Sequence, residues 1–417
     1  MLDMNNTSLF RDKAKNKKIT ESHVGKLFQK LYIPFFSEVL LLLSILVLFY
    51  SSIFTSIDLG FLSPWFLLGA IMFCDKSKIR QIRVNYWFIA FILVVLLSAV
   101  CNIFFGGNPR VLLLGTLIYL QFGFAFLLGQ TISKRYLYDG VLSISVPLAV
   151  LGIWQYFYGS STSAEWVSVA EKGLSRAFAT FGSPNVLGIL MVIMTILSIG
   201  LFLSNKKWWY LASGLLFATT TVITFSRTAW IALLLAFVVM LAIYNYKYLF
   251  FLPISFVVLL IPSIRNRMMV LFDPTYLSDA TLDGRTWSLL NGIFLARQRP
   301  ILGFGPGSYG GQTALNYSSD VYLQGIQSGY TALYYTDNQY LEVLVQTGIV
   351  GLIAFIGFFY SVIVKMYDLY RAKSGKMQLA GIGIVVAFMF SAVTANVMEF
   401  GALSLPVGII IGSLVVE

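Results

Sequence analysis

Residues 184–204 have the sequence PNVLGILMVIMTILSIGLFLS and contain no charged side chain. A transmembrane helix needs about 20 predominantly apolar residues to cross the hydrocarbon core of a bilayer. This stretch meets that requirement, and much of the chain follows the same pattern. Of its 417 residues, 58% are hydrophobic and only 11% are charged, whereas about 25% are charged in soluble domains. We therefore expect an integral membrane protein.

The sequence contains twelve apolar runs that predict membrane-spanning helices. The predicted fold is all-α and polytopic, with about 12 transmembrane helices in a single transmembrane domain over residues 1–417. Residues 1–34 are expected to form a basic cytoplasmic tail, because this charged region is too long for a cleaved signal peptide. The runs lie near 35–54, 58–74, 86–105, 111–130, 138–158, 184–204, 208–225, 229–246, 248–264, 340–364, 379–397 and 400–416.

The positions of Lys and Arg predict the orientation. With the N-terminus in the cytoplasm, twenty of the 29 Lys and Arg residues fall in cytoplasmic segments. Cytoplasmic loops are enriched in these residues, so the inverted topology is disfavoured. Both termini are thus expected on the cytoplasmic side of a bacterial-type cell membrane. The net charge of +11 is explained by this topology, and no nucleic-acid partner is expected.

The outer face has an unusual composition. Eight of its nine basic residues are arginine, whereas lysine dominates inside. Arginine presents a planar, permanently charged fork that suits phosphate, so this bias predicts an anionic ligand. The largest extracytoplasmic loop spans 265–338, and within it residues 283–294 predict a helix start and an amphipathic helix. A second outer loop spans about 159–183.

Two arginines flank predicted spans at this face. Arg227 lies between two apolar runs in Thr224–Trp230. It is either a turn residue that extends to the interface or an inward-facing arginine that holds a phosphate. Arg176 precedes Ser183 and Pro184, which predict the N-cap and first residue of the next span. The helix start accounts for Ser183 and Pro184 but gives no reason for an arginine at position 176.

Two further motifs lie near the end of the large loop. The stretch Gly303–Gly310 contains a G-x-G-x-x-G sequence. A dinucleotide site needs a βαβ unit around this motif, so we predict a tight turn that brings backbone close to a ligand or a span end. Asp337 and Asn338 precede a long apolar run and suit helix capping, and a carboxylate there can also accept a proton. Glu399, near another outer turn, is the alternative carboxylate for accepting this proton.

Metal-assisted chemistry is disfavoured on the outer face. The sequence has a single histidine, His23, which lies in the basic tail. The predicted outer segments contain no D-x-D pair, and hard divalent cations bind through such oxygen ligands. We therefore expect metal-independent chemistry without a cofactor.

The order of these motifs resembles the O-antigen ligase and O-antigen or capsular polysaccharide polymerase family, over about residues 170–355. The resemblance implies a membrane glycosyltransferase of the GT-C type that acts on undecaprenyl-diphosphate-linked oligosaccharides. The order is Arg176, Pro184-Asn185, Ser226-Arg227-Thr228, Gly284-Arg285, Gly303-Phe304-Gly305 and Asp337-Asn338 followed by Gly348-Ile349-Val350-Gly351-Leu352.

The resemblance also implies roles for individual residues. Arg227 and Arg285 would hold the diphosphate, with Arg176 as support. Besides these, we expect Asn185, Asn338 and Glu399 to contact the substrate, because they lie near the same predicted outer turns. The ligases have a histidine before the late span, and its position corresponds to Asp337 here. This departure favours the polymerase branch, which makes capsule or exopolysaccharide, with Asp337 as the catalytic base. A flippase and a chain-length regulator are the implied partners besides membrane lipid.

Two rival functions remain. One is a ligase that transfers the lipid-linked glycan to another acceptor. The other is a transporter of a lipid-linked sugar, which should show internal repeats and broken helices at mid-membrane. The sequence shows no convincing repeat, and most predicted spans are apolar at their centres, so the polymerase is the favoured interpretation.

Overall fold

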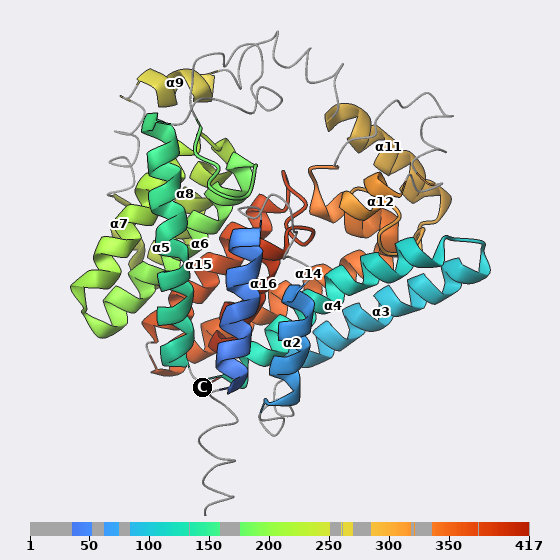
Figure 1. The fold of residues 1–417 in the computed structure, drawn as a ribbon, viewed down its shortest axis with the longest axis horizontal. Helices are drawn as coiled ribbons and strands as arrows, with labels where there is room; N and C mark the ends of the chain where they lie inside the picture. Colours follow the sequence, from blue (N-terminus) through green and yellow to red (C-terminus); the bar gives the residue numbers. More distant parts are fainter. Residues whose placement is uncertain are drawn as a thin grey trace, which may run out of the picture.

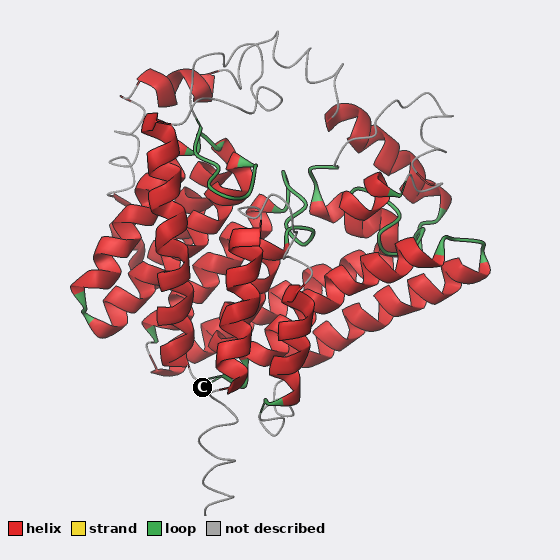
Figure 2. Ribbon diagram, viewed as in Figure 1, coloured by secondary structure: helices red, strands yellow, loops and turns green. Residues whose placement is uncertain are grey.

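The computed structural model describes residues 36–51, 62–74, 84–132, 134–158, 176–250, 260, 262–269, 285–317, 321, 336–373 and 375–416. Within these ranges every regular element is a helix (Figure 2). The predicted all-α class is confirmed for this part of the chain. The basic tail 1–34 and most of the predicted span 248–264 lie outside the described residues.

The helices follow the predicted apolar runs closely, because each run is bounded by charged residues, proline or glycine. An apolar helix, Phe36–Tyr50, opens the described part of the chain. The labelled helices are α2 (Ser63–Met72), α3 (Val84–Phe104), α4 (Pro109–Gly129), α5 (Lys134–Tyr158), α6 (Pro184–Asn205), α7 (Trp208–Ile223), α8 (Arg227–Asn245), α9 (Pro262–Met269), α11 (Arg285–Gln298), α12 (Gln312–Asn316), α14 (Gln339–Lys373), α15 (Lys376–Ser391) and α16 (Gly401–Leu414).

Six of the described helices are long and apolar enough to cross a membrane, namely α3, α4, α5, α6, α8 and α14. Helix Phe36–Tyr50, α2, α7, α15 and α16 are apolar but shorter. The chain is thus a multi-pass membrane protein, and the count of twelve spans stays a prediction. The expected run 379–397 is shorter than predicted, because α15 ends at Ser391 and residues 392–400 form a turn.

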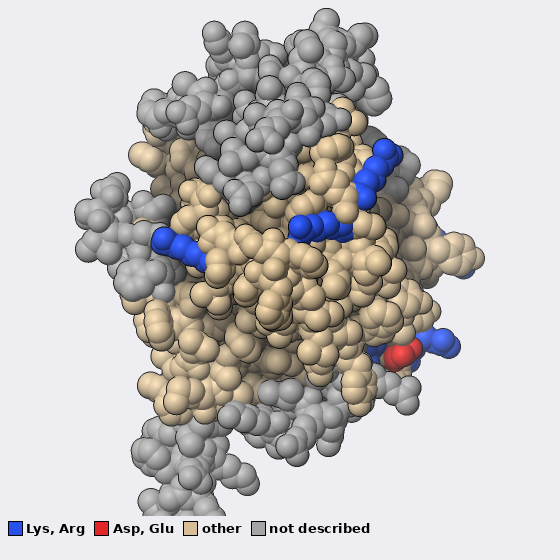
Figure 3. All heavy atoms as spheres, turned by 90° about the vertical axis from the view of Figure 1, so that its right-hand side faces the viewer, with Lys and Arg blue, Asp and Glu red and all other residues tan. Residues whose placement is uncertain are grey.

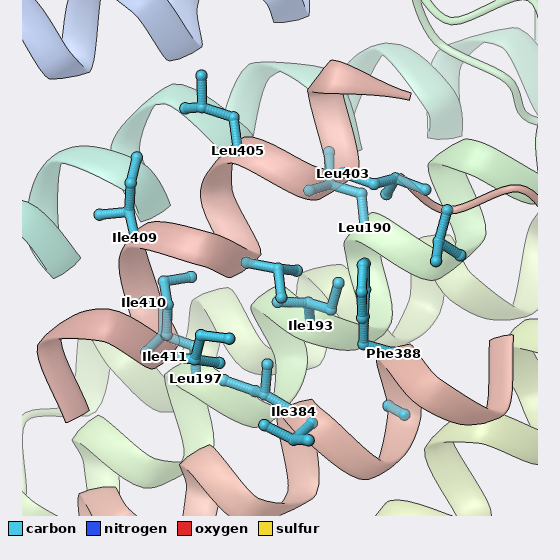
Figure 4. Packing of buried hydrophobic residues seen from close by; sticks show 14 of the residues in the cluster. Leu190, Ile193, Leu197, Ile384, Phe388, Leu403, Leu405, Ile409, Ile410 and Ile411 are labelled. Carbon is cyan, nitrogen blue, oxygen red and sulfur yellow. The ribbon is translucent and has the colours of Figure 1, made fainter. Parts of the chain in front are cut away.

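Helices α6 and α16 form the centre of the bundle. Nearly every residue of α16 is buried, as expected for a helix that is apolar on all sides. Leu190 and Ile193 of α6 lie close to Phe388 of α15 and to the leucines and isoleucines of α16 (Figure 4). At Gly412, a Cβ atom would lie 2.1 Å from the Phe126 carbonyl oxygen, so glycine permits the close packing of α16 on α4.

The periphery of the bundle is apolar and exposed. On α3, Leu93, Leu97 and Phe104 are 58%, 50% and 83% exposed. Figure 3 shows one side of the molecule, on which the few described charged side chains leave a broad uncharged surface between them. Such a surface would make a soluble protein aggregate and is suited to contact with lipid.

Helix α14 is broken at Gly348, whose φ of 70° and ψ of −173° are not helical. The break leaves backbone groups without their usual helical partners. Residues 299–311, which we call the glycine loop, supply the missing hydrogen-bond partners. The Phe304 and Gly305 N–H groups donate to the carbonyls of Val345 and Gln346, at 2.9 and 2.8 Å, and the Ile349 N–H donates to the Pro300 carbonyl at 2.8 Å. The expected approach of this motif to a span is thereby confirmed.

Most of the connecting turns and the two surface helices gather at one end of the bundle, which we call the loop end. It carries α9 and α11 and lies at the top of Figure 1, whereas the C-terminus lies at the opposite end. The extracytoplasmic position of the 265–338 loop and the cytoplasmic position of the C-terminus stay predictions. The turns 176–183, 224–226, 336–338 and 392–400 lie toward the loop end.

Candidate active site at the loop end

The turn between α7 and α8 presents Arg227 as the first residue of α8. Ser226 is the N-cap, and its hydroxyl accepts a hydrogen bond from the Ala229 N–H at 3.4 Å. Phe225 has a φ of 50°, which is rare for a bulky residue and marks a constrained turn. A helix start carries N–H groups that lack intrahelical partners and a partial positive charge. The backbone of this turn therefore favours binding of an anion, and the Arg227 side chain adds a full positive charge.

Arg176 converges on the same turn. Its Nε donates to the Thr224 carbonyl at 3.0 Å, and its Nη2 lies 3.5 Å from the Phe225 carbonyl oxygen and 3.4 Å from Asn185 Oδ1. Burial, and secondarily the charge of the neighbouring Arg227, lower the pKa of Arg176 to about 10. The guanidinium stays charged at neutral pH. Two cations thus lie side by side, an arrangement that an anionic ligand would stabilise.

A third arginine reaches this turn from α9. The Arg267 Nε donates to the Phe225 carbonyl at 3.3 Å, so Arg176 and Arg267 share one backbone acceptor. We call Arg176, Arg227 and Arg267 the arginine cluster. Asn185, a predicted substrate contact, lies next to Pro184 at the start of α6 and orients Arg176. Ser183 occupies the predicted N-cap position, but its side chain makes no capping hydrogen bond.

The other half of the site is the first turn of α14. Asn338 is its cap, because its Oδ1 accepts a hydrogen bond from the Leu341 N–H at 3.0 Å. Asp337 precedes the cap with a φ of 47° and is partly exposed. Of the two residues that suited capping, the structure gives that role to Asn338. The carboxylate of Asp337 is not the capping group.

Glu342 lies one turn further along α14 and is only 1% exposed. Its Oε1 accepts a hydrogen bond from Gln346 Nε2 at 3.1 Å. Its Oε2 accepts from Gln339 Nε2 at 3.1 Å and from Asn396 Nδ2 at 2.5 Å. A buried carboxyl group must be satisfied in this way, because an unpaired one would be very costly.

Glu399 lies in the 392–400 turn, and its carboxyl group is hydrogen-bonded to that of Glu342. It also accepts a hydrogen bond from the backbone of Gln312. Burial raises the pKa of Glu399 above its ordinary value. A Cβ atom on Gly311 would lie 2.0 Å from Glu399 Oε1, so only glycine permits this approach of the glycine loop. Two carboxyl groups therefore meet beneath the loop.

The 392–400 turn connects both halves of the site. Its Thr394 hydroxyl is hydrogen-bonded to that of Thr228, next to Arg227. Its Asn396 donates to Glu342 and to the Gly310 carbonyl, and accepts from the Asn338 N–H at 3.2 Å. The arginine cluster and the carboxyl groups thus belong to one continuous network at the loop end. The described part of the chain has no cluster of His, Cys, Asp and Glu that could hold a metal ion.

Residues 212–356 match a protein-family model described as O-antigen ligase. This part of the chain is similar to the O-antigen ligase family, and we call residues 212–356 the O-antigen ligase domain. The match confirms the resemblance and supports an enzyme that processes lipid-linked glycans at a membrane. No curated protein matches the chain.

The O-antigen ligase domain runs from α7 into the C-terminal part of α14. It contains Arg227, Arg267 and Glu342, whereas Arg176 and Glu399 lie outside the matched residues. Segments on both sides of the domain thus complete the site. They are the 176–183 turn with the start of α6 on one side and the α15–α16 turn on the other.

Arg285 is the first residue of α11 within the O-antigen ligase domain. Its side chain lies outside the described part of the structure, so its predicted role in the diphosphate site stays a prediction. Helix α11 packs on α14, and Figure 1 draws α8 and α11 on opposite sides of the loop end. The predicted amphipathic helix of residues 283–294 begins at Arg285 and extends to Gln298.

Two residues of the site were missed from the sequence. Arg267 was one of several outer arginines without a motif, and no spacing related it to Phe225. Glu342 had the spacing of an ordinary acidic residue in the first turn of a helix, where negative charge is favourable. The signal that could have identified it is its neighbourhood, because Gln339 and Gln346 lie within one turn on either side of a carboxyl group inside an apolar helix.

Proposed function

We propose that this protein polymerises undecaprenyl-diphosphate-linked oligosaccharide repeat units on the outer face of the bacterial cytoplasmic membrane. In this proposal both termini are cytoplasmic, the loop end faces outward, and the 265–338 loop is extracytoplasmic. The O-antigen ligase domain supports the class of reaction. The surplus of Lys and Arg in the opposite segments supports the orientation.

The observation that carries the proposal is the convergence of Arg176, Arg227 and Arg267 on the Phe225 turn. Fixed guanidinium groups bind phosphate oxygens in a bidentate manner. At a helix start they add to the partial charge of the backbone. A membrane-facing site with three adjacent cations suits a polyprenyl diphosphate, which carries several negative charges at the lipid surface.

The reaction follows from this charge distribution. A hydroxyl oxygen of the acceptor glycan attacks the anomeric carbon of the donor, and the bond from that carbon to the diphosphate oxygen breaks. The electron pair of the broken bond stays on the diphosphate, where the arginine cluster stabilises it. The hydroxyl proton passes to a carboxylate at the loop end, for which Asp337 and Glu399 are the candidates. Attack opposite the leaving group inverts the anomeric centre.

Polymerisation is favoured over ligation by the residue at position 337. The family resemblance places a histidine of the ligases at Asp337, and the single histidine of this chain is in the basic tail. The description of the matched family model nevertheless names ligases. Transfer of the glycan to a different acceptor is therefore the second candidate function. It would use the same arginine cluster.

An elongation assay with the purified, full-length protein in liposomes tests the proposal. The substrate is the lipid-linked repeat unit extracted from a source strain that lacks this protein. A polymerase converts this substrate alone into longer lipid-linked chains, which are resolved by gel electrophoresis and mass spectrometry. If the substrate stays at one repeat unit in the absence of a second acceptor, the polymerase proposal is wrong.

A binding assay tests the anion site separately. Undecaprenyl diphosphate without sugar serves as the probe, and native mass spectrometry measures the bound lipid. We expect it to bind more tightly than undecaprenyl monophosphate, because more phosphate oxygens contact the arginine cluster. Equal binding of the two lipids would contradict diphosphate recognition.

A further inference from the structure

Glu342 and Glu399 form a carboxyl pair whose geometry requires a bound proton. Their carboxyl groups are hydrogen-bonded to each other. Two ionised carboxylates repel and have no hydrogen to share, so at least one of the pair is protonated. Such a pair gains and loses protons as a unit. It is a different group from Asp337, the base predicted from the sequence.

The surroundings of the pair keep the two carboxyl groups in place. Three side-chain amides, from Gln339, Gln346 and Asn396, donate to Glu342. Gln346 is itself held by the Tyr119 hydroxyl, which donates to its Oε1 at 2.9 Å, and its Nε2 donates to the Tyr309 carbonyl at 2.6 Å. Side chains of α14 and the 392–400 turn therefore hold Glu342 in place by hydrogen bonds, and Tyr119 of α4 holds Gln346.

The two members of the pair differ in their access to solvent. Glu342 is 1% exposed, whereas Glu399 is partly exposed and lies in a turn. The Glu399 turn is also the one that reaches the arginine cluster, through Thr394 and Thr228. Glu399 is thus the less buried member of the pair, and its turn is the one that contacts the start of α8.

We propose that the Glu342–Glu399 pair is the proton acceptor of glycosyl transfer, with Glu399 as the catalytic residue and Glu342 as its positioning residue. This inference rests on the proposed function. The acceptor hydroxyl gives its proton to Glu399 as its oxygen bonds to the anomeric carbon. The electrons of the broken carbon–oxygen bond go to the diphosphate. The pair then releases the proton to the diphosphate or to water and returns to its starting state.

The raised pKa of Glu399 supports this assignment, because a base works best when its pKa lies near the working pH. The titratable groups that face the pair in the described residues are the hydroxyls of Tyr119 and Tyr309. Both are buried phenols. The pair therefore titrates through its own two carboxyl groups.

The test compares Glu399→Gln with Asp337→Asn in the elongation assay, with Asp139→Asn as a control. Asp139 accepts a hydrogen bond from Tyr210, and both lie in helices away from the loop-end turns. We expect Glu399→Gln to slow elongation by about a hundredfold or more, to retain binding of undecaprenyl diphosphate, and to lose the decline of activity at acidic pH. Glu399→Asp should recover part of the rate. Asp139→Asn should remain close to the unmodified protein, and Asp337→Asn should slow elongation much less than Glu399→Gln does.

A spectroscopic readout makes the test independent of activity. Infrared spectra of the purified protein should show the C=O band of a protonated carboxyl at neutral pH, shifted by D₂O and moved to a different frequency in Glu399→Gln, because the hydrogen-bonding partner of the Glu342 carboxyl changes. Glu342→Gln would place a fourth side-chain amide among the three amides that donate to Glu342. We expect this variant to be less stable, so the test uses Glu399→Gln instead. Absence of the band, or wild-type elongation and pH profile in Glu399→Gln, would overturn the assignment.

The outcomes also separate this inference from the proposed function. If Asp337→Asn abolishes elongation and Glu399→Gln does not, the base is Asp337 and the polymerase proposal stands. If the unmodified protein neither elongates the substrate nor binds undecaprenyl diphosphate, the proposed function fails, and with it the catalytic role of the pair.

Discussion

The hydroxyl groups of Thr228 and Thr394 share a hydrogen bond, with 2.6 Å between their Oγ1 atoms, although 166 positions separate them in the chain. Thr228 follows Arg227 at the start of α8. Thr394 lies in the turn that carries Asn396 and Glu399. The contact therefore joins the part of the site that contains the arginine cluster to the part that contains the two carboxyl groups.

Replacing these threonines should weaken that connection. We expect Thr228→Val and Thr394→Val each to lower stability by about 1 kcal/mol, because each leaves one hydroxyl without its partner. The double variant should lose less than the sum, because both hydroxyls are then gone. Thermal unfolding in detergent measures the three variants. Strict additivity would show that the two hydroxyls do not interact.

Arg227 should be essential for elongation. We expect Arg227→Ala to reduce the elongation rate by about a hundredfold or more, as for other groups that stabilise charge in a transition state. Arg227→Lys should also lose most activity, because an ammonium group cannot make two parallel hydrogen bonds to phosphate.

Arg297→Ala is the matched control for this prediction. Arg297 is exposed in the last turn of α11 and should leave elongation unchanged when removed. All variants are compared at equal amounts of folded protein. The arginine cluster would lose its proposed role if Arg227→Ala and Arg297→Ala elongated glycan at the same rate.

The pH dependence of stability should depend on Glu399. Burial raises the pKa of this carboxyl in the folded protein above its ordinary value of about 4.3. Between these two pKa values the folded state binds more protons than the unfolded state, so its stability falls as the pH rises. Glu399→Gln removes the contribution of this carboxyl to the dependence. We expect the thermal midpoint of Glu399→Gln to fall less between pH 5 and pH 8 than that of the unmodified protein, and parallel curves would contradict the prediction.

Gly348 should tolerate no side chain. Its backbone conformation is essentially restricted to glycine, and a Cβ atom there would lie 2.1 Å from the Ile301 carbonyl oxygen. We expect Gly348→Ala to cost about 2–5 kcal/mol through strain and overlap. Gly401→Ala is the control, because its Cβ would meet only ordinary contacts at 3.4 Å. Similar thermal midpoints for the two variants would contradict the importance of the break.

Much of the fold could be predicted from the sequence, because lipid imposes a simple rule. Every crossing segment must satisfy its own backbone and present apolar side chains, so the positions of α3 to α8 follow directly from the apolar runs. The break at Gly348 could not be predicted in the same way. The run 340–364 is predominantly apolar and contains no proline, and the partners that replace its lost hydrogen bonds come from the distant glycine loop.

The site could be predicted only in part. Arg176 and Arg227 were identified by their unusual place on the outer face, and the structure brings them together. The meeting of Glu342 with Glu399 depends on how α14 packs against the 392–400 turn. Neither residue has a local motif. Long-range packing of this kind leaves no periodic trace in the sequence.

The glycine loop has a fixed length between two attachment points. Near its start, Phe304 and Gly305 are hydrogen-bonded to the broken helix, and near its end the Gly310 carbonyl accepts from Thr336 and Asn396. An insertion or deletion between these points would shift Gly311 relative to Glu399 and tilt the first turn of α14. We expect such a change to inactivate the protein although it replaces none of the residues proposed to act in the site.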